Sequence, residues 1–81
     1  MERELQAKHD SRNSFYGKAH TIQDADGITL RSYWTNVANI KDGKATVFGR
    51  YSNTTLRHIK EFLKQNGYKA ESKSQIEEDY I

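Results

Sequence analysis

The feature that most constrains the fold of this 81-residue chain is one amphipathic helix with start and stop signals at its two ends. Between Tyr51 and Gly67, apolar residues recur three and four positions apart, and this spacing places them on one side of a helix. That side consists of Leu56, Ile59, Phe62 and Leu63. The opposite side is predicted to face solvent and carries Arg57, His58, Lys60, Glu61 and Lys64. Hydroxyl and amide side chains can cap the first turn, and Gly67 can adopt the left-handed conformation that ends a helix.

Three β-prone runs precede the helix, and turn signals separate them. The first run, Phe15 to Ile22, is followed by Asp24-Ala25-Asp26-Gly27, whose Asp-Gly pair suits a tight hairpin. The second, Ile28 to Ile40, is followed by Lys41-Asp42-Gly43-Lys44, and the third is Ala45 to Tyr51. This order predicts an α+β fold: a three-stranded antiparallel β-meander packed on one C-terminal α-helix, or βββα.

The second run decides which side chains face the helix, since alternate residues of a strand point to opposite faces of a sheet. The predicted core face carries Leu30, Trp34, Ala38 and Ile40. The predicted open face carries Thr29, Arg31, Tyr33, Thr35 and Val37. The run is longer than the usual strand of about five or six residues, so we expect a bulge or bend near Asn36 or Asn39.

The two ends of the chain are expected to lie outside the folded unit. Residues 1–13 are polar and predict a flexible or short-helical N-terminal arm. Residues 14–69 are predicted to form the single βββα domain, because a chain of this length supports one core at most. Residues 70–81 predict a disordered, flexible acidic C-terminal tail, with Ile76, Tyr80 and Ile81 as docking points.

Charge is distributed unevenly along the chain. The net charge is +2, yet residues 13–69 hold nine basic and four acidic residues, whereas residues 70–81 hold one basic and four acidic residues. A basic body with an acidic end fits an acidic partner, and it also fits solubility alone. Cysteine is absent, and no apolar run approaches the roughly 18 residues that span a bilayer. We therefore expect a cytoplasmic protein that does not contact a membrane.

The sequence contains no recognisable catalytic or metal-binding pattern. No nucleophile stands at a useful spacing from a base and a third, orienting group. The histidines His9, His20 and His58 lie in different predicted elements, and His58 with Glu61 supplies only two metal ligands. Asp24 to Gly27 fails as a calcium loop, and there is no phosphate-binding glycine loop. We predict no enzyme activity, no cofactor and no metal, and a protein that acts by stoichiometric binding.

A long segment resembles small proteins of phages and prophages of Gram-positive bacteria. Their hallmark is similar to Ser32-Tyr33-Trp34-Thr35-Asn36-Val37-Ala38, followed by the stretch from Gly49 to Leu63 and the Gln65-Asn66-Gly67-Tyr68 end. The resemblance spans most of residues 14–70, and Trp34 stands where a smaller polar residue is expected. It implies a phage accessory protein, located in the host cytoplasm, and assigns no functional residues.

A second resemblance is one of layout. The segment from Trp34 to Lys44, then Phe48-Gly49-Arg50-Tyr51 and a capped helix, resembles the plant AP2 and phage-integrase arm-type DNA-binding fold. In that fold a three-stranded sheet lies in the major groove and one helix backs it. The resemblance implies contacts from Arg31, Tyr33 and Arg50, although this chain lacks the dense arginine set of those DNA readers.

The main functional hypothesis is nucleic-acid association through a basic and aromatic sheet face, because such side chains contact phosphates and stack on bases. The expected contact residues are Arg31, Tyr33, Arg50, Lys18 and His20, with Arg57, Lys60 and Lys64 on the helix at one side.

Two alternatives stay open. The first is a protein-binding inhibitor or modulator of a host or defence factor, similar in role to an anti-CRISPR protein. It would use an exposed strand edge or an aromatic patch that includes Tyr16, Tyr33 and Phe48. The second is a homodimer, since a small core gains from pairing its strand edges.

Overall fold

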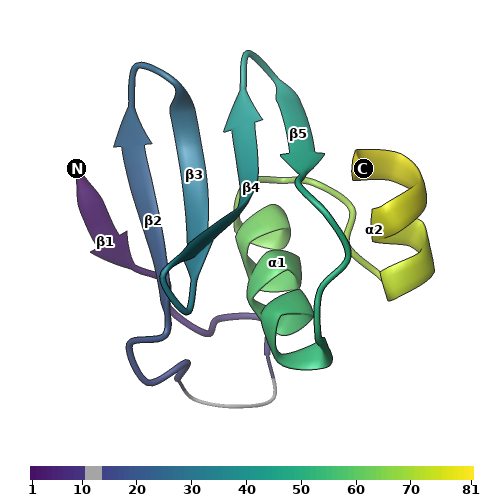
Figure 1. The fold of residues 1–81 in the computed structure, drawn as a ribbon, viewed down its shortest axis with the longest axis horizontal. Helices are drawn as coiled ribbons and strands as arrows, with labels where there is room; N and C mark the ends of the chain where they lie inside the picture. Colours follow the sequence, from purple (N-terminus) through teal and green to yellow (C-terminus); the bar gives the residue numbers. More distant parts are fainter. Residues whose placement is uncertain (11–13) are drawn as a thin grey trace.

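The computed structural model describes residues 1–10 and 14–81, which form an α+β fold of a five-stranded antiparallel sheet and two helices (Figure 1). The strands, in sequence order across the sheet, are β1 (Glu2–Glu4), β2 (Ala19–Asp24), β3 (Gly27–Ser32), β4 (Thr35–Lys41) and β5 (Lys44–Val47). The helices are α1 (Asn53–Gln65) and α2 (Lys73–Tyr80). The predicted three-stranded meander with one helix is wrong. Both termini add an element, because β1 pairs with β2 and α2 packs against β5.

Helix α1 begins and ends where the capping residues predict. The side chain of Ser52 accepts a hydrogen bond from the backbone amide of Thr55, and Gly67 follows the C-cap with a φ of 82°. The predicted apolar stripe is buried, as shown by Leu56, Ile59, Phe62 and Leu63. Two residues of the predicted solvent side, His58 and Glu61, are only 2% and 1% exposed, so their assignment to that side is wrong.

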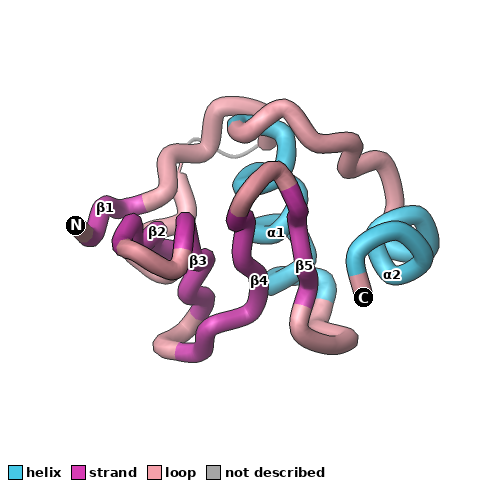
Figure 2. Tube along the Cα trace, turned by 90° about the horizontal axis from the view of Figure 1, so that it is seen from above, coloured by secondary structure: helices cyan, strands magenta, loops and turns pink. Residues whose placement is uncertain are grey.

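The core lies between α1 and one face of the sheet. Leu30 of β3 pairs with Ala38 of β4, which in turn pairs with Val47 of β5, so these three side chains share a face. All three are buried in the same cluster as the stripe of α1. Seen from above, the strands follow one another from β1 to β5 and α2 lies beyond β5 (Figure 2).

Two of the three hairpins follow the turn signals in the sequence. Between β4 and β5, Asp42 and Gly43 have φ angles of 52° and 76°, as a type I′ turn requires. Between β2 and β3, Gly27 has a φ of 94°, and a Cβ there would clash with the backbone carbonyl of Ile40. The Asp42-Gly43 turn is therefore confirmed, and the hairpin expected at Asp24 to Gly27 is present. Its turn residues are Ala25 and Asp26, however, and only Gly27 of the predicted Asp-Gly pair has a positive φ. Gly27 is also fixed by close backbone approach.

The third hairpin divides the predicted strand from Ile28 to Ile40. Tyr33 and Trp34 have φ angles of 49° and 70° and form the two-residue turn between β3 and β4. The prediction that Trp34 faces the core is wrong, because its side chain is 79% exposed. A register shift beside Leu30 leaves Val37 as an extra residue in β4. Val37 is buried rather than on the open face.

The N-terminal segment is ordered across residues 1–10 and crosses α1. Leu5 is buried, and the backbone amide of His9 donates to the Glu61 carboxylate at 2.6 Å. The amide of Gln65 donates to the carbonyl oxygen of Gln6 at 2.7 Å. These contacts contradict the flexible or short-helical arm. The remainder of that prediction, residues 11–13, lies outside the described residues.

The acidic C-terminal segment is a helix rather than a disordered tail. Its N-cap is Ser72, whose hydroxyl accepts from the backbone amide of Gln75 at 3.1 Å. Ile76 is fully buried, and the Tyr80 hydroxyl donates to the Lys69 carbonyl at 2.8 Å, whereas Ile81 is 55% exposed. In the described part of the chain, neither helix has the length and apolar character needed to cross a membrane.

Candidate functional site

Three exposed aromatic side chains define the candidate site. Tyr16 is 75% exposed, Tyr33 48% and Trp34 79%; we call these residues the aromatic cluster. All three have a positive φ, of 54°, 49° and 70° respectively. A left-handed conformation costs a residue with a Cβ about 1–2 kcal/mol, and such strain is concentrated at functional sites. The combination of exposed rings and a strained backbone is therefore a reason to look for a ligand here.

Backbone hydrogen bonds hold the cluster in place. The amide of Tyr33 donates to the carbonyl of Lys18 at 2.9 Å, which joins the β3–β4 turn to the loop before β2. In that loop, the amide of Tyr16 donates to the Ser14 hydroxyl at 2.9 Å, and the amide of Gly17 donates to the Glu4 carboxylate at 3.1 Å. The exposed rings therefore project from a fixed backbone.

Each of the two turn aromatics lies beside a histidine. The ring of Tyr33 stacks on His58 with centroids 5.7 Å apart, and Phe15 meets the same imidazole edge-on at 4.6 Å. The indole of Trp34 lies 6.2 Å from the ring of His20 in a stacked arrangement. These contacts orient the aromatic rings, so part of the ordering cost of binding has already been met in the folded protein.

A hollow of about 160 Å³, which we call the tyrosine pocket, lies beside the cluster. It is lined by Ser14, Phe15, Tyr16 and Lys18 from the loop before β2, by Tyr33, and by Thr54, Arg57 and His58 of α1. Phe15 and His58 are buried, at 5% and 2% exposure, and form its inner wall. The pocket thus has a rigid aromatic interior and a polar, cationic mouth.

His58 belongs to a buried hydrogen-bond network that links β3 to α1. Its Nδ1 lies 2.8 Å from the hydroxyl oxygen of Ser32, and that oxygen lies 3.2 Å from the hydroxyl of Thr55. Burial lowers the pKa of His58, and the positive charge of Arg57 lowers it further, whereas the negative charge of Asp10 raises it. His58 is therefore neutral at neutral pH, and it supports the pocket wall as an uncharged imidazole.

The cationic groups predicted on the sheet face are largely paired with carboxylates. Arg31 lies 3.6 Å and His20 3.3 Å from Glu2, which the N-terminal strand brings onto the same face. Arg50 lies 3.8 Å from Glu77 of α2. Because β1 and α2 were not predicted, neither of these carboxylates was expected beside the proposed contact residues.

The remaining predicted residues lie near the aromatic cluster or along α1. Arg57 donates two hydrogen bonds to the Asp10 carboxylate, which raise the pKa of the guanidinium. Lys18, Lys60 and Lys64 form no ion pair with a carboxylate of the described residues. Together with Tyr33 these lysines, rather than the paired arginines, are the groups available to an external partner.

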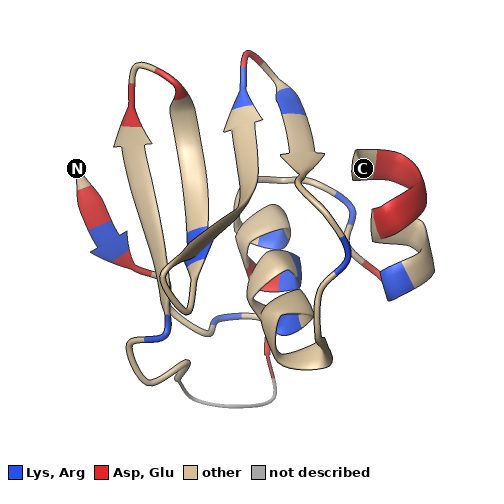
Figure 3. Ribbon diagram, viewed as in Figure 1, with Lys and Arg blue, Asp and Glu red and all other residues tan. Residues whose placement is uncertain are grey.

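The cluster and the basic side of α1 are continuous. Arg57 lines the tyrosine pocket and also a smaller hollow of about 50 Å³, where Lys60 and Lys64 lie with the N-terminal segment. Figure 3 shows basic residues along α1, which also carries Glu61, whereas many of the other acidic residues lie in α2, β1 and the hairpin turns. The surface from Trp34 to Lys64 therefore combines aromatic rings with unpaired positive charge.

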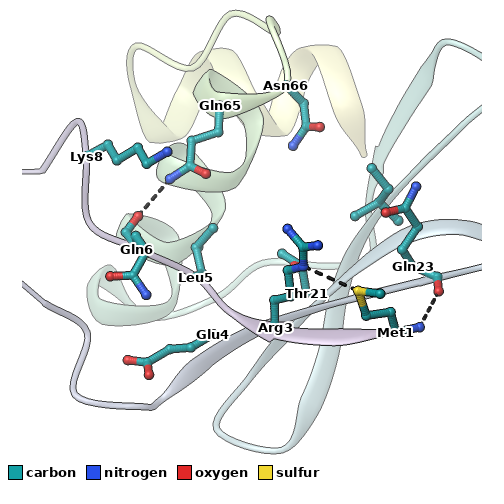
Figure 4. Close-up of a pocket in the computed structure, with 11 residues that line it drawn as sticks. Met1, Arg3, Glu4, Leu5, Gln6, Lys8, Thr21, Gln23, Gln65 and Asn66 are labelled. Carbon is teal, nitrogen blue, oxygen red and sulfur yellow. Dashed lines mark hydrogen bonds between the residues drawn. The ribbon is translucent and has the colours of Figure 1, made fainter.

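A larger hollow of about 300 Å³ lies between the N-terminal segment and the end of α1 (Figure 4). Its polar groups already bind one another: Gln65 reaches the Gln6 carbonyl, and the Met1 amino group donates to the Gln23 carbonyl at 2.7 Å. These contacts fasten the N-terminal segment. We therefore assign this hollow a structural role and place the candidate site at the aromatic cluster.

The structure adds Trp34, Ser14, Phe15, Thr54 and His58 to the contact residues expected from the sequence. No local pattern marks Trp34 as a turn residue, because Tyr-Trp is not a sequence that favours positive φ. No group of three or more His, Asp or Glu side chains in the described residues is arranged to hold a metal ion.

Comparison with protein-family models shows a match over most of the chain. The sequence model of a family described as "Family of unknown function (DUF8033)" matches residues 3–78. No curated protein and no solved structure is significantly similar to the chain. The match covers both helices in large part and nearly the whole sheet, so it concerns the complete fold rather than one motif.

Proposed function

Since this chain belongs to a family of unknown function, DUF8033, its role has to be inferred from its own residues, and we propose that it binds single-stranded nucleic acid through the aromatic cluster. The observation that carries the proposal is the exposure of Tyr16, Tyr33 and Trp34 on a strained, hydrogen-bonded backbone. Aromatic side chains stack on bases of any sequence because every base has a π-face. Single strands offer these faces, whereas a duplex stacks them inside.

The positive charge beside the cluster supports the same proposal. Lys18 flanks Tyr16 and Tyr33, and the smaller hollow continues from Arg57 toward Lys60 and Lys64. A strand whose bases stack on the cluster can lay its phosphates along these amines. Phosphate contacts position a nucleic acid without reading its sequence, which fits stoichiometric binding of low specificity.

The direct test measures binding of a fluorescently labelled twelve-nucleotide single strand by anisotropy. Removing one stacking ring costs about 1–3 kcal/mol, so Trp34→Ala should weaken binding by about 5- to 150-fold. Phe48→Ala is the matched control, because Phe48 is 51% exposed and lines neither of the two hollows on this surface. Equal affinities for the two variants would refute the role of the cluster.

Two further variants separate the cluster from the open sheet face. Arg31 and Arg50 are paired with Glu2 and Glu77, so Arg31→Ala and Arg50→Ala should each weaken binding less than Trp34→Ala does. If either arginine variant weakened binding more than Trp34→Ala does, the contact surface would lie on the open sheet face rather than at the aromatic cluster.

Salt dependence tests the contribution of the lysines. For single strands the slope of log affinity against log salt is about −0.7 per neutralised phosphate. Three contacts, from Lys18, Lys60 and Lys64, predict a loss of about 20-fold between roughly 50 and 200 mM salt. An affinity that hardly changes over this range would exclude phosphate contacts by these residues.

A protein partner is the second candidate, and a specific observation favours it. Arg31, Arg50 and Arg57 are engaged by Glu2, Glu77 and Asp10, which reduces the charge available for phosphates. Tyrosine and tryptophan are also the residues that dominate protein interfaces. A pull-down that recovers one host protein, is insensitive to nuclease and is lost with Trp34→Ala would favour an inhibitor or modulator of that protein.

Other expectations from the sequence stay predictions. They are the phage origin, the cytoplasmic location, the absence of catalysis and the formation of a homodimer. For the homodimer, both sheet edges are poor pairing surfaces: β1 has three charged residues, and α2 packs against β5. Sedimentation at two concentrations tests it directly.

A further inference from the structure

We propose that the tyrosine pocket holds a single one-ring nucleobase, so that the protein prefers pyrimidines in a single strand. This inference rests on the proposed function and deepens it. Its first support is size. A cavity of about 150 Å³ is known to accept a benzene ring, and the tyrosine pocket measures about 160 Å³. One six-membered ring matches that space more closely than the larger fused two-ring system of a purine does.

The inner wall of the pocket suits a flat ligand. Phe15 and Tyr33 both contact the imidazole of His58, with interplanar angles of 62° and 29°. A planar ring that enters the pocket therefore meets aromatic faces and edges, the arrangement in which aromatic pairs are stable. Because Phe15 and His58 are buried, these surfaces cannot turn away to solvent.

His58 also offers a polar atom to the ligand. Its Nδ1 is bound by Ser32, while its Nε2 has no hydrogen-bond partner among residues 1–10 and 14–81. A neutral imidazole presents Nε2 as a donor in one tautomer and as an acceptor in the other. Thymine, uracil and cytosine all carry both donors and acceptors on their edges, so either tautomer can bind a pyrimidine.

The mouth of the pocket provides for the rest of the nucleotide. Lys18 is exposed there and forms no ion pair with a carboxylate of the described residues. Its amine can reach the phosphate beside the inserted base. A free base has no phosphate and would lack this contact. Trp34 does not line the pocket, and Tyr16 lines it but is 75% exposed, so both rings can also meet neighbouring bases. Insertion of one base and stacking of others are therefore compatible.

The test compares twelve-nucleotide single strands of thymidine and of deoxyadenosine, and a deoxyadenosine strand with one thymidine at its centre. With the parent protein, the thymidine strand should bind about tenfold more tightly or better than the deoxyadenosine strand. The single central thymidine should restore most of that difference, because one pocket accepts one base.

A pocket-filling variant makes the test specific. Thr54 lines the pocket and is exposed, so Thr54→Leu should fold, block the pocket and abolish the preference for thymidine. Asn53→Leu, on the adjacent exposed position outside the pocket, should keep the preference.

The outcomes separate the two proposals. Equal affinities for thymidine and deoxyadenosine strands, a purine preference, or a preference that survives Thr54→Leu would overturn the pocket while binding itself stands. Failure of the parent protein to bind any of the strands would overturn the proposed function, and the pocket inference with it.

Discussion

The hydroxyl of Ser32 and the Nδ1 of His58 lie 2.8 Å apart in the interior, and this hydrogen bond joins the end of β3 to the middle of α1. Ser32 immediately precedes the turn formed by Tyr33 and Trp34, and Tyr33 stacks on the same imidazole. The core and the candidate site are therefore joined at His58. Substitutions in this network should mainly lower the stability of the fold, and should also affect the position of the aromatic cluster.

Ser32→Ala should destabilise the protein by about 1–3 kcal/mol, because it leaves polar atoms of His58 and Thr55 buried without their partner. The free energy of unfolding from urea titrations measures the effect. Ser74→Ala, at an exposed position of α2, is the control and should stay within about 0.5 kcal/mol of the parent. Equal stabilities of the two variants would contradict the buried network.

Stability should fall as pH decreases from about 7.5 to 5.5. The pKa of His58 is lowered in the folded protein by burial and by Arg57, so the unfolded chain takes up a proton below about pH 6.5 while the folded one does not. Proton uptake by the unfolded state favours unfolding, at up to about 1.4 kcal/mol per pH unit. His58→Gln should remove this part of the slope. Parallel profiles of stability against pH for the parent and His58→Gln would show that the pH dependence comes from groups other than His58.

Ile76→Ala should cost about 2–5 kcal/mol of unfolding free energy, because Ile76 is completely buried by α2 and a methyl side chain would leave a cavity. Glu78→Ala, on the exposed side of the same helix, should change little. If the C-terminal segment were disordered, both substitutions would be neutral in urea unfolding.

Glu61→Ala should release the N-terminal segment from α1. The Glu61 carboxylate accepts the backbone amide of His9, and bonds to charged groups are worth about 1.5–3 kcal/mol. Hydrogen exchange at the His9 amide should therefore accelerate about tenfold or more. Glu71→Ala, a loss of an exposed carboxylate, should leave that amide unaffected. Unchanged exchange in Glu61→Ala would show that other contacts hold the segment.

Trp34→Gly should stabilise the protein and weaken nucleic-acid binding. Trp34 has a φ of 70°, and relief of that conformation exceeds the added freedom of the unfolded glycine, for a net gain of about 1 kcal/mol or less. Thr35→Gly, at the first residue of β4, should instead destabilise by about 0.5–1 kcal/mol. A loss of stability in Trp34→Gly would mean that the indole contributes packing that outweighs its strain.

Local patterns were sufficient for some elements. Helix α1 was predictable because its stripe and its caps at Ser52 and Gly67 are contained in one segment. The turns at Gly27 and Gly43 were predictable for the same reason, since glycine itself favours the required φ. Tyr33, Lys18 and Arg57 line the tyrosine pocket, and their role as contact residues stays a prediction.

Other features depend on segments that are distant in sequence. Trp34 is forced into a left-handed turn by strand pairing on both sides and by the bond from Tyr33 to Lys18, against its own preference. His58 and Glu61 look solvated on a helical wheel, yet they are covered by the loop before β2 and by the N-terminal segment. Likewise, Arg31 and Arg50 form ion pairs with Glu2 and Glu77, which lie in the two terminal elements.

The sequence by itself determined those elements whose stabilising contacts lie within a few residues: the long helix, its caps and the two glycine turns. Only the tertiary structure decided which charges are paired, which polar side chains are buried and which aromatic rings are exposed. The physical reason is that burial and ion pairing are set by whatever packs on a surface. Here that packing comes from the two ends of the chain, whose composition alone is too polar to reveal it.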